Sequence, residues 1–356
     1  MKNYVVMPDS LKAYIANVFS KVGVDRQGAN SIAELLVHAD VRNVHSHGVI
    51  RTIPYIDKIR QGGASKTSSY KIVHETPNTA VIDAEGGLGA LAGEIAVKMC
   101  REKAKKNLIS MVSVRNSNHF GMAGHWAMKL AGDDMIGFAC SNTDPSMSPP
   151  GAIVPFMGNN PFAFAFKASE KYPEVCTDMA TSAAALGKAK DMAKRGKQIP
   201  EGWLLDKNGN PTTDVNECFM LVPMAGHKGY GIAFVVEMFA TLLSGGVLSP
   251  DINNQDLPDV PELSSQCFGC INISAFRDLN EFHKSSEKYI EDIHALPMKE
   301  GMGTAKYPGE IEYGCKLYNL ENGVVLPANL IDELINLGTE LGLDGSFLKA
   351  QETDRQ

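Results

Sequence analysis

Short apolar runs alternate with helical stretches across the middle of the chain, and this alternation restricts the possible folds more than any other feature. The runs cover 79–84, 108–115, 136–141 and 162–167, and the helical stretches cover 90–106 and 121–132. Strands that alternate with helices in this way are typical of a β-sheet covered by helices. The sequence therefore predicts an α/β layer in the middle of the chain.

Both ends of the chain have helical periodicity instead. Apolar residues recur at helical spacing through the first forty residues, and a third helix follows, in which Pro54 predicts a kink or a restart. From about residue 276 the chain is amphipathic and helical again. Because 356 residues exceed what one core usually serves, we expect a helical lobe from 1–72 plus 276–356 and an α/β lobe over 73–275.

Composition narrows the class of protein. The net charge is −7 without a long basic run, which argues against nucleic-acid or anionic-membrane partners. The apolar stretch 229–246 is too short to span a bilayer, so we expect a central buried helix there. The 7 cysteines are an odd number, and Cys267 and Cys270 lie in an apolar run. We therefore expect reduced core thiols and a cytoplasmic protein.

Three glycines resemble a dinucleotide-binding fingerprint. Gly87, Gly89 and Gly93 follow a predicted strand and open a predicted helix. The fingerprint needs an acidic residue after the next strand, but that strand ends in Arg115 and Asn116. An arginine there could meet the phosphate of NADP. We interpret the glycines as serving a tight turn and close helix packing, so this motif alone does not predict a Rossmann domain.

The stretch "VHSHGVIR" (44–51) concentrates polar chemistry. If a helix starts near Ser46, then His47, Arg51 and Tyr55 lie on one stripe of its surface. The alternative is that Ser46 caps the helix and the other residues form a solvated face. These residues alone leave both interpretations open.

A second cluster, "RNSNHFG" (115–121), follows a predicted strand, where α/β proteins concentrate their sites. Carbonyl reduction by a nicotinamide needs a group that titrates near neutrality, and histidine suits this role. A substrate carboxylate needs a fork-shaped donor, for which arginine is suited. His47, His119 and Arg51 together predict this chemistry.

A metal-dependent hydrolase is the alternative from another class. His45 and His47 form an HxH pair, and His119 or His125 could complete a zinc site. Such pairs usually lie on a strand, whereas this one lies between two predicted helices. No carboxylate partner lies close by in sequence.

Several ordered blocks together resemble the malate/L-lactate dehydrogenase family, which lies outside the Rossmann dehydrogenases and includes sulfolactate dehydrogenase, ureidoglycolate dehydrogenase and diketogulonate reductase. The blocks are "HSHGVIR" (45–51), "SNHFG" (117–121), "NTDP" (142–145), "GNNPFAFA" (158–165), "DMATS" (178–182), 195–214, "GHKGYG" (226–231) and "YPGE" (307–310). The order of the blocks and their span of about residues 10–320 make the resemblance specific.

The resemblance implies a large mixed β-sheet that binds NAD or NADP, a homodimer, and a small 2-oxo or 2-hydroxy acid as substrate. It implies that His47 or His119 moves the proton and that Ser46 and Arg51 bind the substrate. Malate or lactate is the default substrate, and ureidoglycolate is the second candidate. The implied cofactor contacts are Thr143, Cys176, Thr177, Asp178, Met179, Ala180, Thr181, Ser182, His227, Lys228, Gly309 and Glu310.

Local chemistry supports two of these contacts. Thr181 or Ser182 is expected near a helix N-terminus, which attracts a phosphate, and Lys228 is expected in a glycine-flanked turn, from which it can reach a pyrophosphate.

Overall fold

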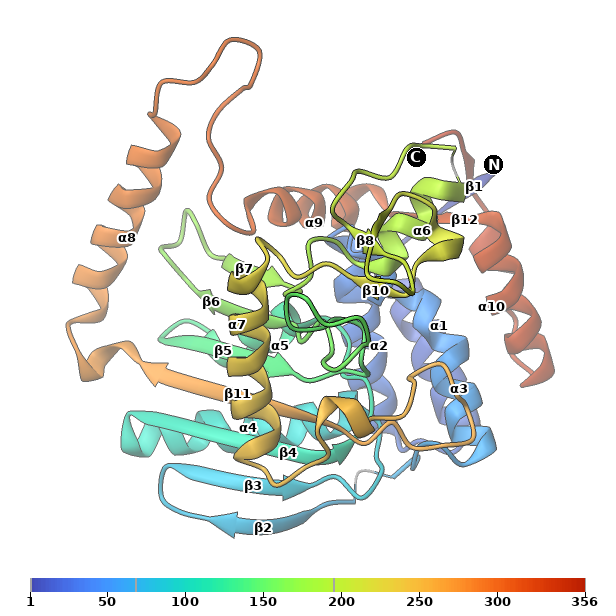
Figure 1. Cartoon of the computed structure of the whole chain (residues 1–356), viewed down its shortest axis with the longest axis horizontal. Helices are drawn as coiled ribbons and strands as arrows, with labels where there is room; N and C mark the ends of the chain where they lie inside the picture. Colours follow the sequence, from blue (N-terminus) through green and yellow to red (C-terminus); the bar gives the residue numbers. More distant parts are fainter. Residues whose placement is uncertain (1, 68, 195, 356) are drawn as a thin grey trace.

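A seven-stranded mixed sheet forms the centre of the computed structural model, which describes residues 2–67, 69–194 and 196–355 (Figure 1). Its strand order is β2-β3-β4-β11-β5-β6-β7, and only β3 and β4 pair in parallel. The strands are β2 Lys71–Glu75, β3 Thr79–Asp83, β4 Ile109–Ser117, β5 Met135–Ser141, β6 Phe162–Phe166, β7 Val175–Met179 and β11 Ser264–Asn272. The predicted mixed-sheet α/β fold is confirmed.

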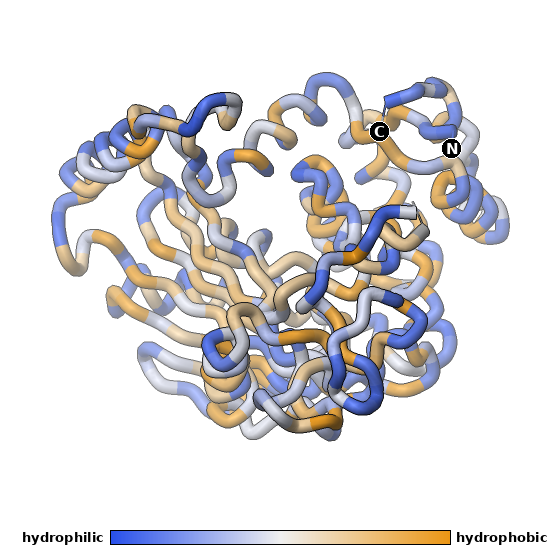
Figure 2. Tube along the Cα trace, turned by 45° about the horizontal axis from the view of Figure 1, so that its top comes forward, coloured by the Kyte–Doolittle hydropathy of each residue, from blue (hydrophilic) through white to orange (hydrophobic). Residues whose placement is uncertain are grey.

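Strand β11 lies at the middle of this sheet although it comes late in the sequence. It pairs antiparallel with β4 on one side and β5 on the other, so both of its hydrogen-bonding edges are paired. Cys267 and Cys270 are 0% and 1% exposed there, which confirms them as core thiols. Hydrophobic stretches are concentrated in the central strands (Figure 2).

Two helices cover one face of the sheet. These are α4 (Gly89–Asn107) and α5 (Ala123–Ala131), which share a buried core with the N-terminal helices. Gly93 lies so close to the ring of Trp126 that a Cβ there would be 2.9 Å from it. A Cβ on Gly89 would be 2.2 Å from the Asn118 carbonyl oxygen. These glycines therefore allow close packing, as the sequence predicted.

The apolar stretch 229–246 forms α7 (His227–Glu237) and a π-helical turn, η4 (Met238–Leu242), on the other face. The expectation of a fully buried helix is wrong. Val236 and Ala240 pack on the sheet, but apolar side chains on the outer side are exposed. They are Phe234, Val235, Met238, Leu242 and Leu243. These side chains lie on the side away from the sheet and have no cover among the described residues.

The N-terminal helices α1 (Pro8–Lys21), α2 (Arg26–Val41) and α3 (Thr52–Gln61) pack beside this layer. A small sheet joins the two ends of the chain, with β1 (Asn3–Val6) between β12 (Val324–Pro327) and β13 (Glu352–Thr353). Helices α9 (Glu310–Asn322) and α10 (Ala328–Glu340) flank it. Pro54 is the third residue of α3, where no N–H is needed, so α3 starts near the proline and continues beyond it.

Helix α8 (Leu279–His294) lies apart from the N-terminal helices, beside the end of the sheet that β6 and β7 form (Figure 1). Phe282 contacts Phe166, and Ile290 packs with Val175. The division into lobes 1–72 plus 276–356 and 73–275 stays a prediction.

A separate small unit contains α6 (Leu186–Lys194) and three short strands, β8 (Leu204–Leu205), β9 (Pro211–Thr212) and β10 (Met220–Leu221). Its own apolar cluster includes Ile199, Leu204 and Leu221. Arg195, the first residue of the matched block 195–214, lies outside the described residues. No helix in the described part of the chain is long and apolar enough to cross a membrane.

Candidate active site

His119 lies in the segment after β4 and is contacted by residues from several other parts of the chain. The Glu262 carboxylate accepts the backbone N–H of His119 at 2.7 Å, and the Tyr55 hydroxyl lies 2.6 Å from His119 Nδ1. Asn118 donates to the carbonyls of Gly86 and Gly87 and accepts the N–H of Glu262. The imidazole is therefore fixed by contacts from α3, β4 and the loop before β11.

His47 stacks against His119. The ring centroids are 5.5 Å apart with 29° between the planes, and Ser46 Oγ lies 2.9 Å from His47 Nδ1. Burial and then the charge of Arg51 lower the pKa of His47 to about 4. The same two causes, in the same order, lower the pKa of His119. Both rings are therefore neutral at pH 7.

No helix starts at Ser46, so the supposition that placed His47, Arg51 and Tyr55 on one helical stripe is wrong. Two 3₁₀ turns, η1 (His45–His47) and η2 (Val49–Arg51), precede α3, and Ser46 caps no helix. The reason is Asp40, whose buried carboxylate accepts the Val49 N–H at 2.7 Å. A Cβ on Gly48 would be 2.0 Å from this carboxylate, so glycine is required there. Arg51 and Tyr55 nevertheless line one pocket, and His47 stacks on His119, which lines it too.

A small pocket opens beside these groups. It is lined by Arg51, Pro54, Tyr55, Lys58, Leu88, Asn118, His119, Gln255 and Asp256. Arg51 donates through Nε to the Ser46 carbonyl at 2.8 Å. Its terminal nitrogens make no hydrogen bond within the described residues. An arginine fork beside two neutral imidazoles can bind a carboxylate and exchange a proton with a neighbouring hydroxyl.

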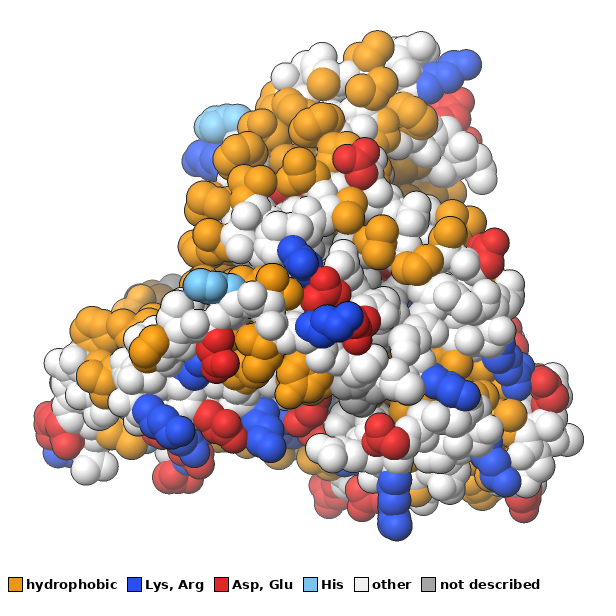
Figure 3. Space-filling model, turned by 90° about the horizontal axis from the view of Figure 1, so that it is seen from below, with side chains coloured by type: hydrophobic (Ala, Val, Ile, Leu, Met, Phe, Trp, Pro, Cys, Tyr) orange, Lys and Arg blue, Asp and Glu red, His pale blue; other side chains and the backbone are white. Residues whose placement is uncertain are grey.

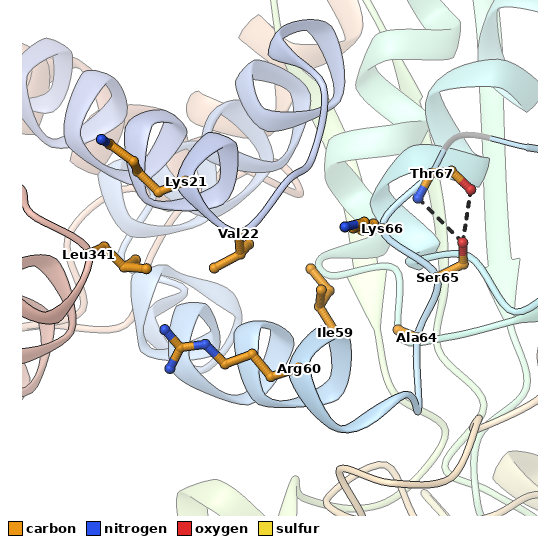
Figure 4. A pocket seen from close by; sticks show the side chains of 9 residues that line it. All are labelled: Lys21, Val22, Ile59, Arg60, Ala64, Ser65, Lys66, Thr67 and Leu341. Carbon is orange, nitrogen blue, oxygen red and sulfur yellow. Dashed lines mark hydrogen bonds between the residues drawn. The ribbon is translucent and has the colours of Figure 1, made fainter.

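A larger hollow lies elsewhere, between α1, α3 and the loop 64–67 (Figure 4). Lys21 points away from its centre, and Arg60 forms an ion pair with Glu340 at 3.0 Å. Ser65 and Thr67 hydrogen-bond to each other. Its polar groups diverge or pair with one another, so size alone does not mark the site.

The segments with implied cofactor contacts converge near the end of β7. Thr181 donates through N–H and hydroxyl to the Asn159 carbonyl, while Thr143 donates its hydroxyl to the Asn159 side chain. Gly309 lies so close to Cys176 that a Cβ would be 2.9 Å from its backbone. These contacts bring residues from distant parts of the chain together.

The helix N-terminus near Thr181 is not the one expected. Helix α6 begins only at Leu186, whereas Thr181 accepts the Met224 N–H at 2.8 Å, just before α7. A Cβ on Gly229 would be 2.6 Å from the Thr181 carbonyl oxygen. Ser182 forms a bridge with Pro223. The start of α7, where His227 and Lys228 are exposed, therefore lies next to this segment.

The other residues that the resemblance implies as cofactor contacts differ in burial and in hydrogen-bond partners. Asp178 accepts the Gly124 N–H at 2.8 Å, which joins β7 to the start of α5, five residues after His119. Glu310 binds His294 and Lys306. Thr177 and Ala180 are half-buried, and Met179 is exposed.

Arg115 has a partner within the sheet. Its Nε donates to the Asp83 carboxylate on β3 at 3.1 Å, and Asn116 donates to the same carboxylate. Its charge therefore has a partner, and it gives no particular support to NADP over NAD.

The metal-site alternative finds no supporting geometry. His45 binds Asp40 at 2.8 Å, and His125 binds His38 at 2.9 Å, so neither turns toward the His47–His119 stack. Within residues 2–67, 69–194 and 196–355, no group of three His, Cys, Asp or Glu residues is arranged to hold a metal ion.

Sequence reasoning missed Glu262, Gln255 and Asp256. All three lie in a segment (249–265) that has only turn chemistry in the sequence. Asn118, by contrast, stands inside the "SNHFG" block, so its position beside His119 was a usable signal.

Comparisons with known proteins show the family to which the chain belongs. A model of the malate/L-lactate dehydrogenase family matches residues 6–335. Malate dehydrogenase of Pyrococcus horikoshii is 34% identical over 97% of this chain and 98% of its own. Ureidoglycolate dehydrogenase (NAD(+)) of Escherichia coli is 30% identical over 85% of this chain and 86% of its own.

Comparison of the fold with solved structures indicates the same family. The solved sulfolactate dehydrogenase of Methanocaldococcus jannaschii superposes with a TM-score of 0.90 at 34% identity, covering 96% of this chain and 99% of that one. The resemblance predicted from the sequence blocks is confirmed. This chain is a dehydrogenase that belongs to the malate/L-lactate dehydrogenase family.

Proposed function

We propose that the protein transfers a hydride between a nicotinamide nucleotide and a small 2-hydroxy or 2-oxo acid. The observation that carries this proposal is the His47–His119 stack beside the unpaired fork of Arg51. Malate or lactate is the default substrate, and ureidoglycolate is the second candidate; both malate and ureidoglycolate occur in names of relatives.

His119 is the proton carrier in this proposal. A neutral imidazole accepts the proton of a substrate hydroxyl at Nε2 when Nδ1 carries the hydrogen and donates it to the Tyr55 oxygen. Burial raises the pKa of the Tyr55 hydroxyl, so the phenol stays neutral. The Tyr55 contact also stabilises the imidazolium that forms. His47, which contacts Ser46 and stacks on His119, is the second candidate.

Arg51 couples substrate binding to this proton. Its charge contributes to the lowered pKa of both His47 and His119. A substrate carboxylate on the guanidinium offsets that charge, so the pKa of the imidazoles rises when the acid binds. Proton uptake is then favoured in the direction of 2-oxo acid reduction.

The residues fit a nicotinamide nucleotide. In the first turn of α7 the backbone N–H groups of His227 and Lys228 have no partner among the described residues, and the exposed Lys228 side chain adds a positive charge beside Thr181 and Ser182. An anionic pyrophosphate suits these donors. When bound, the nucleotide supplies or accepts the hydride. The protein is assigned NAD or NADP without preference between them.

A homodimer is part of the proposal. The outer side of α7 and η4 exposes apolar side chains, among them Phe234 at 53% and Leu242 at 56%. From below, hydrophobic side chains gather in one broad area, while many charged ones lie elsewhere on that face (Figure 3). A second copy would cover such a surface.

The free state of the 7 cysteines supports a cytoplasmic location.

The test is a panel of 2-oxo acids offered with NADH and with NADPH, followed by the absorbance of the reduced nucleotide. The proposal expects consumption of at least one nucleotide that depends on both the acid and the enzyme. Absence of turnover with every acid and both nucleotides would contradict it.

A further inference from the structure

The pocket lining combines a free arginine fork with an acidic part. Arg51 and His119 belong to this lining, and Gln255 and Asp256 form its acidic part. These two residues belong to the segment between η5 (Ser249–Asp251) and β11. Their side chains make no hydrogen bond within the described residues. They are therefore available to a ligand.

Lys58 does not offset this acidity. Its ammonium donates to the Val260 carbonyl at 3.1 Å, and the residue is only 4% exposed. Burial lowers the pKa of Lys58, and the charges of Glu262, Asp256 and Asp259 act against this lowering. Burial and then the charge of Asp256 raise the pKa of Asp144. One buried cation thus faces several carboxylates.

The loop that carries Asp256 has a defined local structure. The Asn254 side chain accepts the backbone N–H of Asp256 at 2.8 Å, and Asn253 donates to the Pro261 carbonyl at 2.7 Å. The N–H of Asn253 also bonds the Glu262 carbonyl. Glu262 also accepts the backbone N–H of His119, so the loop that carries Asp256 is connected to the proposed proton carrier.

We propose that Gln255 and Asp256 select the far end of the substrate, favouring a 2-oxo acid whose side group is uncharged and donates hydrogen bonds over one that carries a second anionic group. This inference rests on the proposed function and specifies its substrate class. With its first carboxylate on Arg51, a short substrate extends across the pocket toward Asp256. A second carboxylate there meets a like charge, whereas an amide N–H there donates a charge-assisted hydrogen bond.

The test compares oxaloacetate with 2-oxosuccinamate, its half-amide. The two acids share length and 2-oxo acid end and differ only at the far group. We expect kcat/KM for the half-amide to exceed that for oxaloacetate by roughly tenfold or more, as one like-charge contact exchanged for a hydrogen bond implies. A ratio of one or below would overturn the proposal.

Two variants separate the role of Asp256 from general charge effects. Asp256→Asn is expected to raise kcat/KM for oxaloacetate and to bring the ratio close to one. Asp259→Asn, on the same loop but outside the pocket lining, is the matched control and should keep the wild-type ratio. A ratio that Asp256→Asn leaves unchanged, or that both variants change equally, would overturn the assignment.

Pyruvate distinguishes failure of this inference from failure of the proposed function. It carries the 2-oxo acid end without a polar far group, so its turnover tests the chemistry alone. Turnover of pyruvate or oxaloacetate without preference for the half-amide rejects the selection by Asp256 and keeps the dehydrogenase. Absence of turnover with these three acids and with the rest of the 2-oxo acid panel, with both nucleotides, rejects both.

Discussion

Two histidine pairs in this protein differ in access rather than in acidity. His47 and His119 stack beside the pocket, and His38 and His125 lie 2.9 Å apart between α2 and α5. The pKa of all four imidazoles is lowered, first of all by burial. His119 of the first pair lines the pocket together with Arg51, whose terminal donors are free, whereas neither of the two pockets described above is lined by His38 or His125. A lowered pKa therefore does not mark a site by itself; a path for the ligand and a group to hold it are also needed.

The largest expected effect separates the two pairs. His119→Ala should lower kcat for a 2-oxo acid by roughly 10²–10⁴-fold, because it removes the proton carrier. His125→Asn, in the pair without a pocket, should leave kcat within about threefold of wild type. His47→Ala, measured alongside, tests the second candidate. Full activity of both His47→Ala and His119→Ala would refute the mechanism.

Arg51 lies beside the first histidine pair only, and its proposed role is to bind the substrate carboxylate. Arg51→Ala should weaken binding of acid substrates by about 1.5–3 kcal/mol, seen as a rise in KM of roughly 10- to 150-fold. Arg60→Ala, on the adjoining helix α3 but paired with Glu340, is the matched control. Unchanged steady-state kinetics for Arg51→Ala would exclude it from the site.

The buried pair should affect stability rather than turnover. Its folded-state pKa values lie below the ordinary 6.5, at about 3 for His38. The unfolded chain then binds more protons between these values, so the stability from neutral burial is present above about pH 6.5 and is lost as pH falls below it.

Urea unfolding at several pH values between 7.5 and 4.5 measures this loss, up to about 1.4 kcal/mol per pH unit for each ring. A variant with His38→Gln and His125→Gln should show a shallower dependence. A dependence as steep as that of the wild type would show that the pair does not titrate on unfolding.

The smallest effect concerns Tyr55. Tyr55→Phe removes the hydroxyl from His119 Nδ1, which should lower kcat by roughly fivefold, about 1 kcal/mol, and shift its pH profile while KM changes little. Tyr14→Phe is the matched control, since its hydroxyl donates to the Leu334 carbonyl at 2.8 Å, away from the pocket. A change in KM alone would point to substrate contact instead.

Long apolar runs predicted most of the sheet correctly, because strands covered on both faces have an unambiguous pattern. Strand β2 was missed, since all of its residues are exposed at the sheet edge and no apolar alternation marks it. The burial of α7 was overestimated for the opposite reason. Apolar residues that face solvent in one chain look the same in sequence as core residues.

The site was predictable where its residues cluster in sequence. The "HSHG" and "SNHFG" blocks brought out His47 and His119, which the fold stacks together. Glu262 and Asp256 come from a loop more than 130 residues further along, which only the pairing of β11 with β4 brings to His119. No local sequence pattern predicts that contact. The sequence also did not predict that α3 starts after Gly48. This start depends on the carboxylate of Asp40, which accepts the Val49 N–H.

The most direct measurement is a crystal structure of the protein with a nicotinamide nucleotide and oxamate, an unreactive analogue of a 2-oxo acid. The account predicts that the oxamate carboxylate lies on the Arg51 fork and that its oxo oxygen lies within about 2.6–3.2 Å of His119 Nε2. Oxamate bound away from Arg51, with His119 facing neither the ligand nor the nucleotide, would contradict it.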